Sequence, residues 1–286
     1  MYFRILSLII LLSLSCYISA ESVEDISKIK NHCHKISSRL ASVGYKECLS
    51  HKFEMTRGYS VKGLPIIVKN IHAGSDTNQI GEPAHHRVLI IGGFHGDEYS
   101  TVSIIFKWIT LLNRYYTGSY HWKIVPLLNP DGLLQRSSKR TNTNEVDLDR
   151  NFPVSSSDYN ANQYWEEITN WAPEYFPGNY ALSEPETQWL AEEIEQYQPD
   201  AIITIHAAIN SLDYKSSINK QSKNGAQYQQ FITTFPGSFN QYVGTEINIP
   251  ILTVELPYAD IMPTNTAINE IWKNLIKWLN LHIESS

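Results

Sequence analysis

Apolar residues recur along the chain in short runs that are separated by longer stretches of mixed character. Four runs have the length and apolar content of buried strands, at residues 88–91, 122–128, 201–205 and 250–256. Helical spacing of apolar residues follows at 99–116, at 183–197 and from Thr264 to the C-terminus. Strands that alternate with helices predict an α/β fold, in which helices cover both faces of a largely parallel sheet.

The segments outside this alternation are patterned as well. Residues 22–50 predict a helical cap, because Ile26, Ile29, Cys33, Ile36 and Leu40 share one helical stripe. Residues 57–68 predict a β-hairpin that enters the sheet. The letters SEPE at 183–186 predict a capping box that opens the following helix. Residues 133–182 are too long for a plain connector, so we expect them to contribute to function.

Composition and charge narrow the classes of protein. The chain has 286 residues, of which 42% are hydrophobic, and a formal net charge of -6. This acidic balance, without a basic patch, argues against a nucleic-acid binder. Residues 1–20 resemble a cleaved signal peptide, with Arg4 before an apolar core and small residues before Glu21; the alternative is an uncleaved anchor. We expect an exported protein, periplasmic or secreted, without stable membrane insertion after signal removal.

The two remaining cysteines, Cys33 and Cys48, lie in the predicted cap at residues 21–54. An even pair in an exported chain favours one disulfide, and the alternative is two buried thiols. His32 and His34 flank Cys33, and we expect them to be solvated helix residues rather than metal ligands.

Candidate chemistry gathers at the ends of the predicted strands. The stretch GGFHGDE at 92–98 places His95 and Glu98 on a tight turn, and His206 ends a later strand. In parallel sheets, ligands bind outside the carboxyl ends of the strands. Two imidazoles and a carboxylate are the ligands of catalytic zinc sites, which keep a position open for water. The alternative is a histidine that caps a helix and a satisfied core histidine.

Three further residues suit the same chemistry. Glu255 interrupts a buried strand, where a carboxylate is costly unless it is paired or functional. It could take a proton from a metal-bound water, and the alternative is a structural ion pair. Arg140 and Arg150 offer guanidinium forks that suit an oxyanion and a substrate carboxylate. Taken alone, they would be ordinary surface arginines.

These blocks together resemble the zinc metallocarboxypeptidase family. The resemblance rests on GGFHGDE, NPDG at 129–132, RTNTNEVDLDRNFP at 140–153, IITIHA ending beyond His206, and PILTVELP around Glu255. It covers roughly residues 55–285 and looks most like a bacterial branch, the murein peptide amidases. It implies a catalytic domain over 55–286 with an α/β/α sandwich and a mixed, mostly parallel sheet of about eight strands.

The resemblance also implies roles for single residues. His95, Glu98 and His206 would bind one Zn2+ per chain, and Glu255 would be the general base and then the proton donor. Arg140 would stabilise the oxyanion, while Arg150, Asp149 and Asn151 would contact the substrate.

Position 149 departs from the family, which usually carries Asn there. An ionised aspartate only accepts hydrogen bonds. We therefore expect Asp149 to meet an ammonium group of the substrate or to orient Arg150. The gating tyrosine of carboxypeptidases has no clear counterpart by spacing, and Tyr228 and Tyr242 are the candidates.

The expected reaction is hydrolysis of the γ-D-glutamyl–meso-diaminopimelate amide in murein peptides. The alternatives are a carboxypeptidase that trims the C-termini of proteins or murein peptides, an aspartoacylase-like amidohydrolase, and an inactive wall-binding module. The block at 140–153 and the strand-borne Glu255 favour the peptidases.

Overall fold

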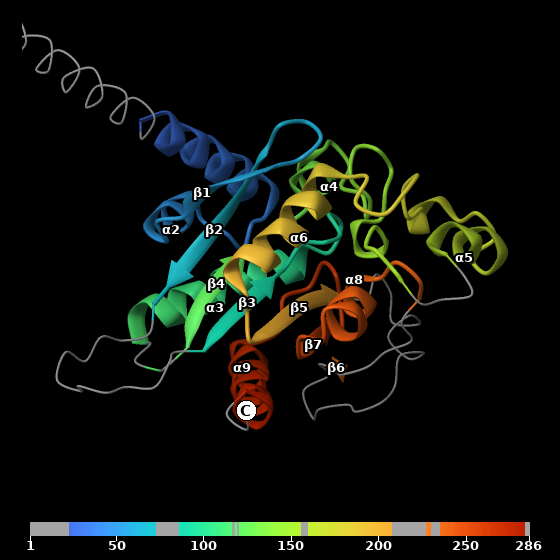
Figure 1. Ribbon diagram of the computed structural model, residues 1–286. Helices are drawn as coiled ribbons and strands as arrows, with labels where there is room; N and C mark the ends of the chain where they lie inside the picture. The colour runs from blue at the N-terminus through green and yellow to red at the C-terminus, as the bar shows by residue number, and fades with distance from the viewer. Residues whose placement is uncertain are drawn as a thin grey trace, which may run out of the picture.

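The computed structural model describes residues 23–72, 86–115, 118, 120–155, 160–207, 227–229 and 235–283. Their centre is a seven-stranded mixed sheet in the order β1-β2-β4-β3-β5-β7-β6 (Figure 1). The strands are β1 Glu54–Tyr59, β2 Pro65–Ile71, β3 Arg87–Ile91, β4 His121–Val125, β5 Ala201–Ala207, β6 Gln227–Gln229 and β7 Ile251–Leu256. The central strands β4, β3, β5 and β7 run parallel, and the pairs at both edges are antiparallel. The expected mixed α/β sheet is confirmed, with seven strands in the described ranges instead of about eight.

Helices cover both faces of this sheet. The helices of the described ranges are the helix over 23–39, α2 Tyr45–Ser50, α3 Tyr99–Tyr115, α4 Pro130–Leu134, α5 Ala161–Glu167, α6 Pro185–Tyr197, α8 Phe239–Gln241 and α9 Asn265–His282. Of these, α5 buries no residue and lies to one side of the sheet (Figure 1). Side chains alternate across a strand, so Val88 and Ile90 pack with α3 and α9, while Leu89 and Ile91 pack with α6 and α8. Two cores on opposite faces of one sheet make the expected α/β/α sandwich (Figure 1).

The N-terminal cap belongs to one of these two cores. Cys33 and Cys48 are joined in a disulfide, as expected, and both are fully buried with α3. Polar contacts add to the packing, since the hydroxyls of Ser42 and Ser103 lie 2.6 Å apart. The predicted signal peptide at 1–20 lies outside the described residues. Within the described ranges, no helix is long and apolar enough to cross a membrane.

Two local predictions from the sequence are wrong. The residue at the N-cap of α6 is Glu184, and no side chain caps this helix. Ser183 instead donates its hydroxyl hydrogen to the Glu184 carboxylate, at 2.7 Å. The second error concerns His32, which is buried rather than solvated. Among the described residues, neither ring nitrogen of His32 has a hydrogen-bond partner.

Burial of His32 makes the cap sensitive to acid. Desolvation, helped by the nearby Lys35 cation, lowers the pKa of His32 to about 4. The unfolded chain keeps the ordinary pKa and therefore binds a proton more readily than the folded chain below about pH 6.5. Stability from a neutral His32 is present above that pH and is lost as the pH falls towards 4.

We expect His32→Leu to remove this loss, since an apolar side chain needs no proton and no hydrogen-bond partner. Between pH 7.5 and 4.5 the wild type should lose about 2 kcal/mol more unfolding free energy than the variant. Urea unfolding at both pH values measures the difference, and the exposed neighbour His34→Leu serves as control. Equal acid losses in wild type and His32→Leu would refute the expectation.

Candidate active site

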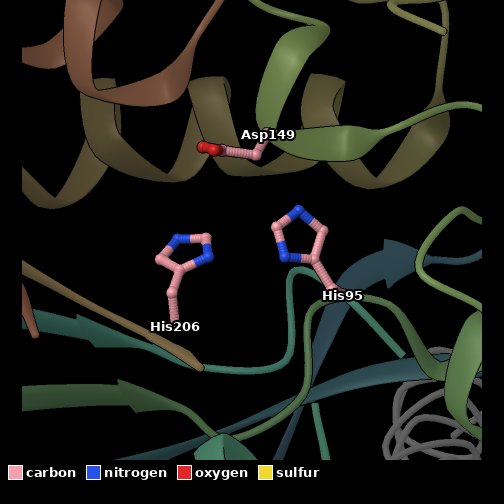
Figure 2. Close-up of side chains that lie close together, drawn as sticks. All are labelled: His95, Asp149 and His206. Atoms are coloured by element: carbon pink, nitrogen blue, oxygen red, sulfur yellow. The ribbon is translucent and has the colours of Figure 1, made fainter. Parts of the chain in front are cut away.

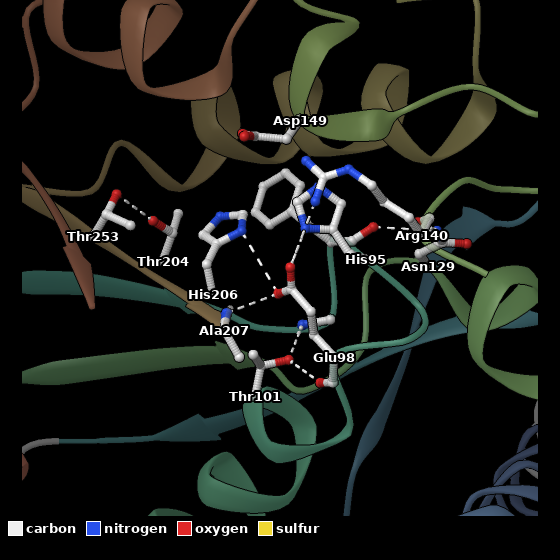
Figure 3. A network of polar contacts seen from close by, with 12 residues as sticks. His95, Glu98, Thr101, Asn129, Arg140, Asp149, Thr204, His206, Ala207 and Thr253 are labelled. Carbon is white, nitrogen blue, oxygen red and sulfur yellow. Dashed lines mark hydrogen bonds and ion pairs between the residues drawn. The ribbon is translucent and has the colours of Figure 1, made fainter. Parts of the chain in front are cut away.

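The predicted metal ligands meet at the carboxyl edge of the parallel strands. His95 lies in the turn that leaves β3, and Glu98 directly precedes α3. His206 lies near the end of β5, in register with Glu255 on β7. The sheet therefore brings the pair His95 and Glu98 close to His206, which is more than 100 positions further along the sequence (Figure 3).

Close packing of the backbone holds the turn that carries His95. A Cβ atom on Gly96 would lie 2.1 Å from the backbone of Gly132, so only glycine fits where this turn meets α4. The Asn129 side chain donates to the carbonyl oxygens of Phe94 and Arg140, both at 3.1 Å. The NPDG block thus ties the metal-binding turn to the start of the arginine-bearing segment.

The three predicted ligands form a compact donor set. Nδ1 of His95 lies 2.6 Å from one oxygen of Glu98, and Nδ1 of His206 lies 3.8 Å from the other. The two imidazole rings are 5.0 Å apart at their centres, and all three residues are buried. Figure 3 shows both Nδ1 atoms directed at the same carboxylate. Two imidazole nitrogens and a carboxylate fit the ligand preference of zinc.

Asp147, which the sequence analysis missed, holds this site together. It is fully buried, and its Oδ1 lies 3.1 Å from Nε2 of His95. Its Oδ2 accepts hydrogen bonds from Nε of Arg140 at 3.0 Å and from Nε of Arg150 at 3.2 Å. A carboxylate on Nε2 orients the ring so that Nδ1 points towards the Glu98 carboxylate, with which it would share a metal ion. The only signal in the sequence is an aspartate between two arginines, which is common on surfaces.

Aromatic residues position both arginine side chains. The Tyr175 ring lies 4.4 Å from the Arg150 guanidinium carbon and 5.4 Å from that of Arg140. The Phe235 ring covers Arg150 at 3.7 Å. Tyr175 belongs to the long irregular segment that we expected to be functional, but nothing in the sequence singled out these two rings.

Asp149 faces the same space as the two histidines. One of its carboxylate oxygens and one ring nitrogen each of His95 and His206 lie within 4.8 Å of one another. Figure 2 shows the carboxylate above the gap between the two rings. Burial raises the pKa of Asp149, while electrostatic attraction to the imidazole groups of His206 and His95 opposes this rise. This carboxylate therefore lies close enough to the metal ligands to act on a substrate bound there.

Asn151 has a different environment from the other predicted substrate contacts. It is fully buried, and its side-chain nitrogen donates to Pro177 O, Tyr180 O and Ser183 Oγ. Its side-chain oxygen accepts from the Thr187 hydroxyl at 2.6 Å. These partners occupy the side chain, so its surroundings do not support the expected contact with substrate.

Glu255 has the environment of a proton carrier. Burial, with a smaller contribution from the Glu98 carboxylate, raises the pKa of Glu255 to about 8. Among the residues that the structure describes, Glu255 forms no ion pair, so the alternative of a structural pair finds no partner there. A carboxyl group that titrates near neutral pH can both accept and return a proton.

The gating tyrosine remains without a described counterpart. Tyr242 stacks on Phe152, with ring centres 5.4 Å apart. It lines a surface cavity together with Arg87 and Asp200, which lie at the opposite end of the strands from His206. The side chain of Tyr228 lies outside the described residues.

Fold and site together define a metallopeptidase. Residues 49–223 match the zinc carboxypeptidase family, and the chain belongs to that family. Murein peptide amidase A of Escherichia coli K12 is 28% identical over 213 residues, covering 66% of this chain and 79% of the relative. The murein peptide amidase A of Vibrio campbellii is 26% identical over 207 residues, covering 70% and 77%.

Solved structures bear out the fold. Thrombin activatable fibrinolysis inhibitor superposes with a TM-score of 0.59 at 15% identity, over 83% of this chain and 71% of that one. Carboxypeptidase A from Helicoverpa armigera superposes with a TM-score of 0.54 at 16% identity, over 80% and 68%.

We expect Asp147→Asn to weaken zinc binding about tenfold or more, because the amide cannot hold the His95 ring as the carboxylate does. Competition with a chromogenic chelator measures the dissociation constant of zinc. Asp200→Asn, a carboxylate at the opposite end of the strands, is the matched control and should bind zinc like the wild type. Unchanged zinc affinity in a folded Asp147→Asn protein would contradict the role of Asp147.

Proposed function

We propose that the protein hydrolyses the γ-D-glutamyl–meso-diaminopimelate amide of murein peptides. The observation that carries this choice of substrate is the adjacent pair Asp149 and Arg150 beside the metal ligands. Asp149 places a negative charge beside the positive charge of Arg150, so this pair suits a zwitterion better than a bare carboxylate. The far end of the diaminopimelate residue carries one ammonium and one carboxylate, and its second carboxylate lies next to the scissile amide. Similarity to murein peptide amidases supports the same substrate.

In this proposal the ammonium of diaminopimelate lies against Asp149 and the carboxylate against Arg150. Within the described residues, Arg150 donates a hydrogen bond only through Nε, to Asp147. Its two terminal nitrogens can therefore donate to a substrate carboxylate. The rings of Tyr175 and Phe235 contact the guanidinium of Arg150 and limit its rotation. Substrate would thus be anchored on the leaving-group side of the scissile amide.

The chemistry follows from the residues around that amide. A zinc ion held by His95, Glu98 and His206 would polarise the carbonyl group and lower the pKa of the attacking water. Glu255 takes the proton of this water and later returns it to the leaving amine. Arg140 donates hydrogen bonds to the oxyanion of the tetrahedral intermediate. The amide C–N bond breaks, and the products are a free glutamyl carboxylate and a free amine.

Export completes the proposal. Murein lies outside the cytoplasmic membrane, and residues 1–20 have the pattern of a signal peptide. The disulfide between Cys33 and Cys48 supports an oxidising compartment, because such bonds are rare in the cytosol. We therefore propose a periplasmic or secreted enzyme.

A zinc carboxypeptidase that trims C-terminal residues is the second candidate. Arg150, which contacts the Tyr175 and Phe235 rings, favours it, because a guanidinium held in this way can also bind a plain α-carboxylate. Asp149 argues against it by placing a negative charge beside that carboxylate.

The first test is turnover of L-Ala-γ-D-Glu-meso-diaminopimelate by zinc-loaded protein, followed by mass spectrometry. We expect release of free diaminopimelate, and Glu255→Gln should lower kcat at least about 100-fold because an amide cannot carry the proton. A tripeptide that stays intact, while an ordinary C-terminal dipeptide is cleaved, would favour the carboxypeptidase. Cleavage at an unchanged rate by Glu255→Gln would refute the role of Glu255.

The role of Asp149 has its own test. We expect Asp149→Asn to reduce the preference for the diaminopimelate tripeptide over its 2-aminopimelate analogue, which lacks the ammonium, about tenfold. The ratio of kcat/KM for the two peptides measures this preference. Glu145→Gln, an exposed carboxylate on the same segment, is the control and should keep the wild-type ratio. The same ratio in Asp149→Asn would show that Asp149 does not meet the ammonium.

A further inference from the structure

The segment 140–151 carries both arginines and both aspartates of the site, yet its regular structure is limited to one turn, Leu148–Arg150. Ordering an irregular segment costs conformational entropy, and its few internal hydrogen bonds do not offset this cost in free energy. Side chains outside the segment must therefore hold it in place. Two buried asparagines, Asn142 near its start and Asn151 at its end, make these contacts.

Asn142 organises the first part of the segment. Its side-chain oxygen accepts hydrogen bonds from the backbone nitrogens of Asn144 at 3.0 Å and Val146 at 3.1 Å. Its side-chain nitrogen donates to Glu184 at 2.7 Å and to Glu186 at 3.4 Å. Asn142 thus closes the turn on one side and connects it to the start of α6 on the other.

Asn151 connects the far end of the segment to the same place. Its side-chain oxygen accepts from the Thr187 hydroxyl and, at 3.3 Å, from the backbone nitrogen of Glu184. Its side-chain nitrogen reaches the Ser183 hydroxyl at 3.0 Å. Both ends of the arginine-bearing segment are therefore held by the five residues from Ser183 to Thr187.

The polar side chains at the start of α6 bond to this segment, and none of them caps the helix. Glu184 is buried, and its carboxylate accepts hydrogen bonds from Asn142, from Asn144 at 2.8 Å and from Ser183. Glu186 is also buried and accepts from the backbone nitrogen of Val61, at 3.3 Å. The letters SEPE therefore form a grip on the segment 140–151 instead of a capping box.

We propose that Glu184 and Glu186 are positioning residues for the reaction, which hold Asn142 and thereby place Arg140 and Arg150 against the substrate. The proposal rests on the roles assigned to these two arginines. Displacement of Arg140 lowers kcat, because it acts on the oxyanion, whereas displacement of Arg150 raises KM, because it acts on bound substrate.

The surroundings of Glu186 favour a protonated, uncharged carboxyl group at this position. Burial, together with the carboxylates of Asp131 and Glu184, raises the pKa of Glu186 to about 7 against the opposing effect of backbone hydrogen bonds. Asp131, on α4, is held by the Ser60 hydroxyl at 2.6 Å and the Lys62 backbone nitrogen at 3.0 Å. Near neutral pH Glu186 is therefore partly protonated, which offsets part of the repulsion among three buried carboxyl groups.

The chain offers a matched set of variants for the test. Glu184→Ala removes the acceptor of Asn142 and Asn144, whereas Glu184→Gln retains a carbonyl oxygen that can accept from both. Ile271→Ala, in α9 on the opposite face of the sheet, is the control for general loss of stability. Each zinc-loaded full-length variant is compared with the wild type by hydrogen exchange of the peptide covering 140–151 and by kcat and KM.

We expect Glu184→Ala to increase exchange in 140–151 and to lower kcat/KM about tenfold or more, with changes in both kcat and KM. Glu184→Gln should restore both measurements, and Ile271→Ala should lower Tm without either effect. Unchanged exchange in Glu184→Ala, equal effects of Ile271→Ala, or no rescue by Glu184→Gln would each overturn the proposal. The exchange measurement needs no substrate, so it stands even where the murein tripeptide is not cleaved.

Discussion

The site depends on one buried carboxylate, that of Asp147. It contacts the His95 ring and both arginines, and its Oδ1 also accepts from the Asp149 backbone nitrogen at 3.1 Å, which caps the turn carrying Asp149 and Arg150. Because the carboxylate is shielded from water, each of these contacts is stronger than it would be at a surface. The cationic neighbours hold the pKa of Asp147 well below its usual range although burial opposes this. The proposed metal ligand, oxyanion donor and substrate anchor thus share one fixed point.

Much of the fold could be predicted because periodicity carries it. The apolar runs that became β3, β5 and β7 are buried on both faces, so their sequences need no alternation, and their carboxyl ends define where ligands bind. His95, Glu98, His206 and Glu255 could be placed at one edge because each lies at a recognisable point of such a strand or of the turn that follows. This reasoning needs only the order of elements and not the geometry of any side chain.

The remaining features depend on contacts between distant segments, which local patterns do not record. The letters SEPE predict a cap wherever they precede a helix, yet here Asn142 and Asn151 lie within reach and offer Glu184 and Ser183 other partners. His32 shows the same limit, because a histidine beside polar neighbours indicates an exposed helix face, yet the folded chain buries it. In both cases tertiary packing decides which of two chemically reasonable partners a polar side chain meets.

The charges on the segment that Asp147 holds bear on the choice of substrate. With Asn at position 149, Arg150 would have no carboxylate on the residue before it, and its positive charge would suit the single carboxylate at the end of an ordinary peptide. Asp149 cancels that charge without moving either arginine, because Asp147 and the grip from α6 hold the segment independently of the side chain at 149. A bare carboxylate then gains less binding free energy, whereas a group that also carries an ammonium recovers this free energy through its contact with Asp149. Under this proposal, one substitution on a segment that is held from outside changes the preferred substrate, while the proposed metal ligands and the proposed proton carrier Glu255 stay the same.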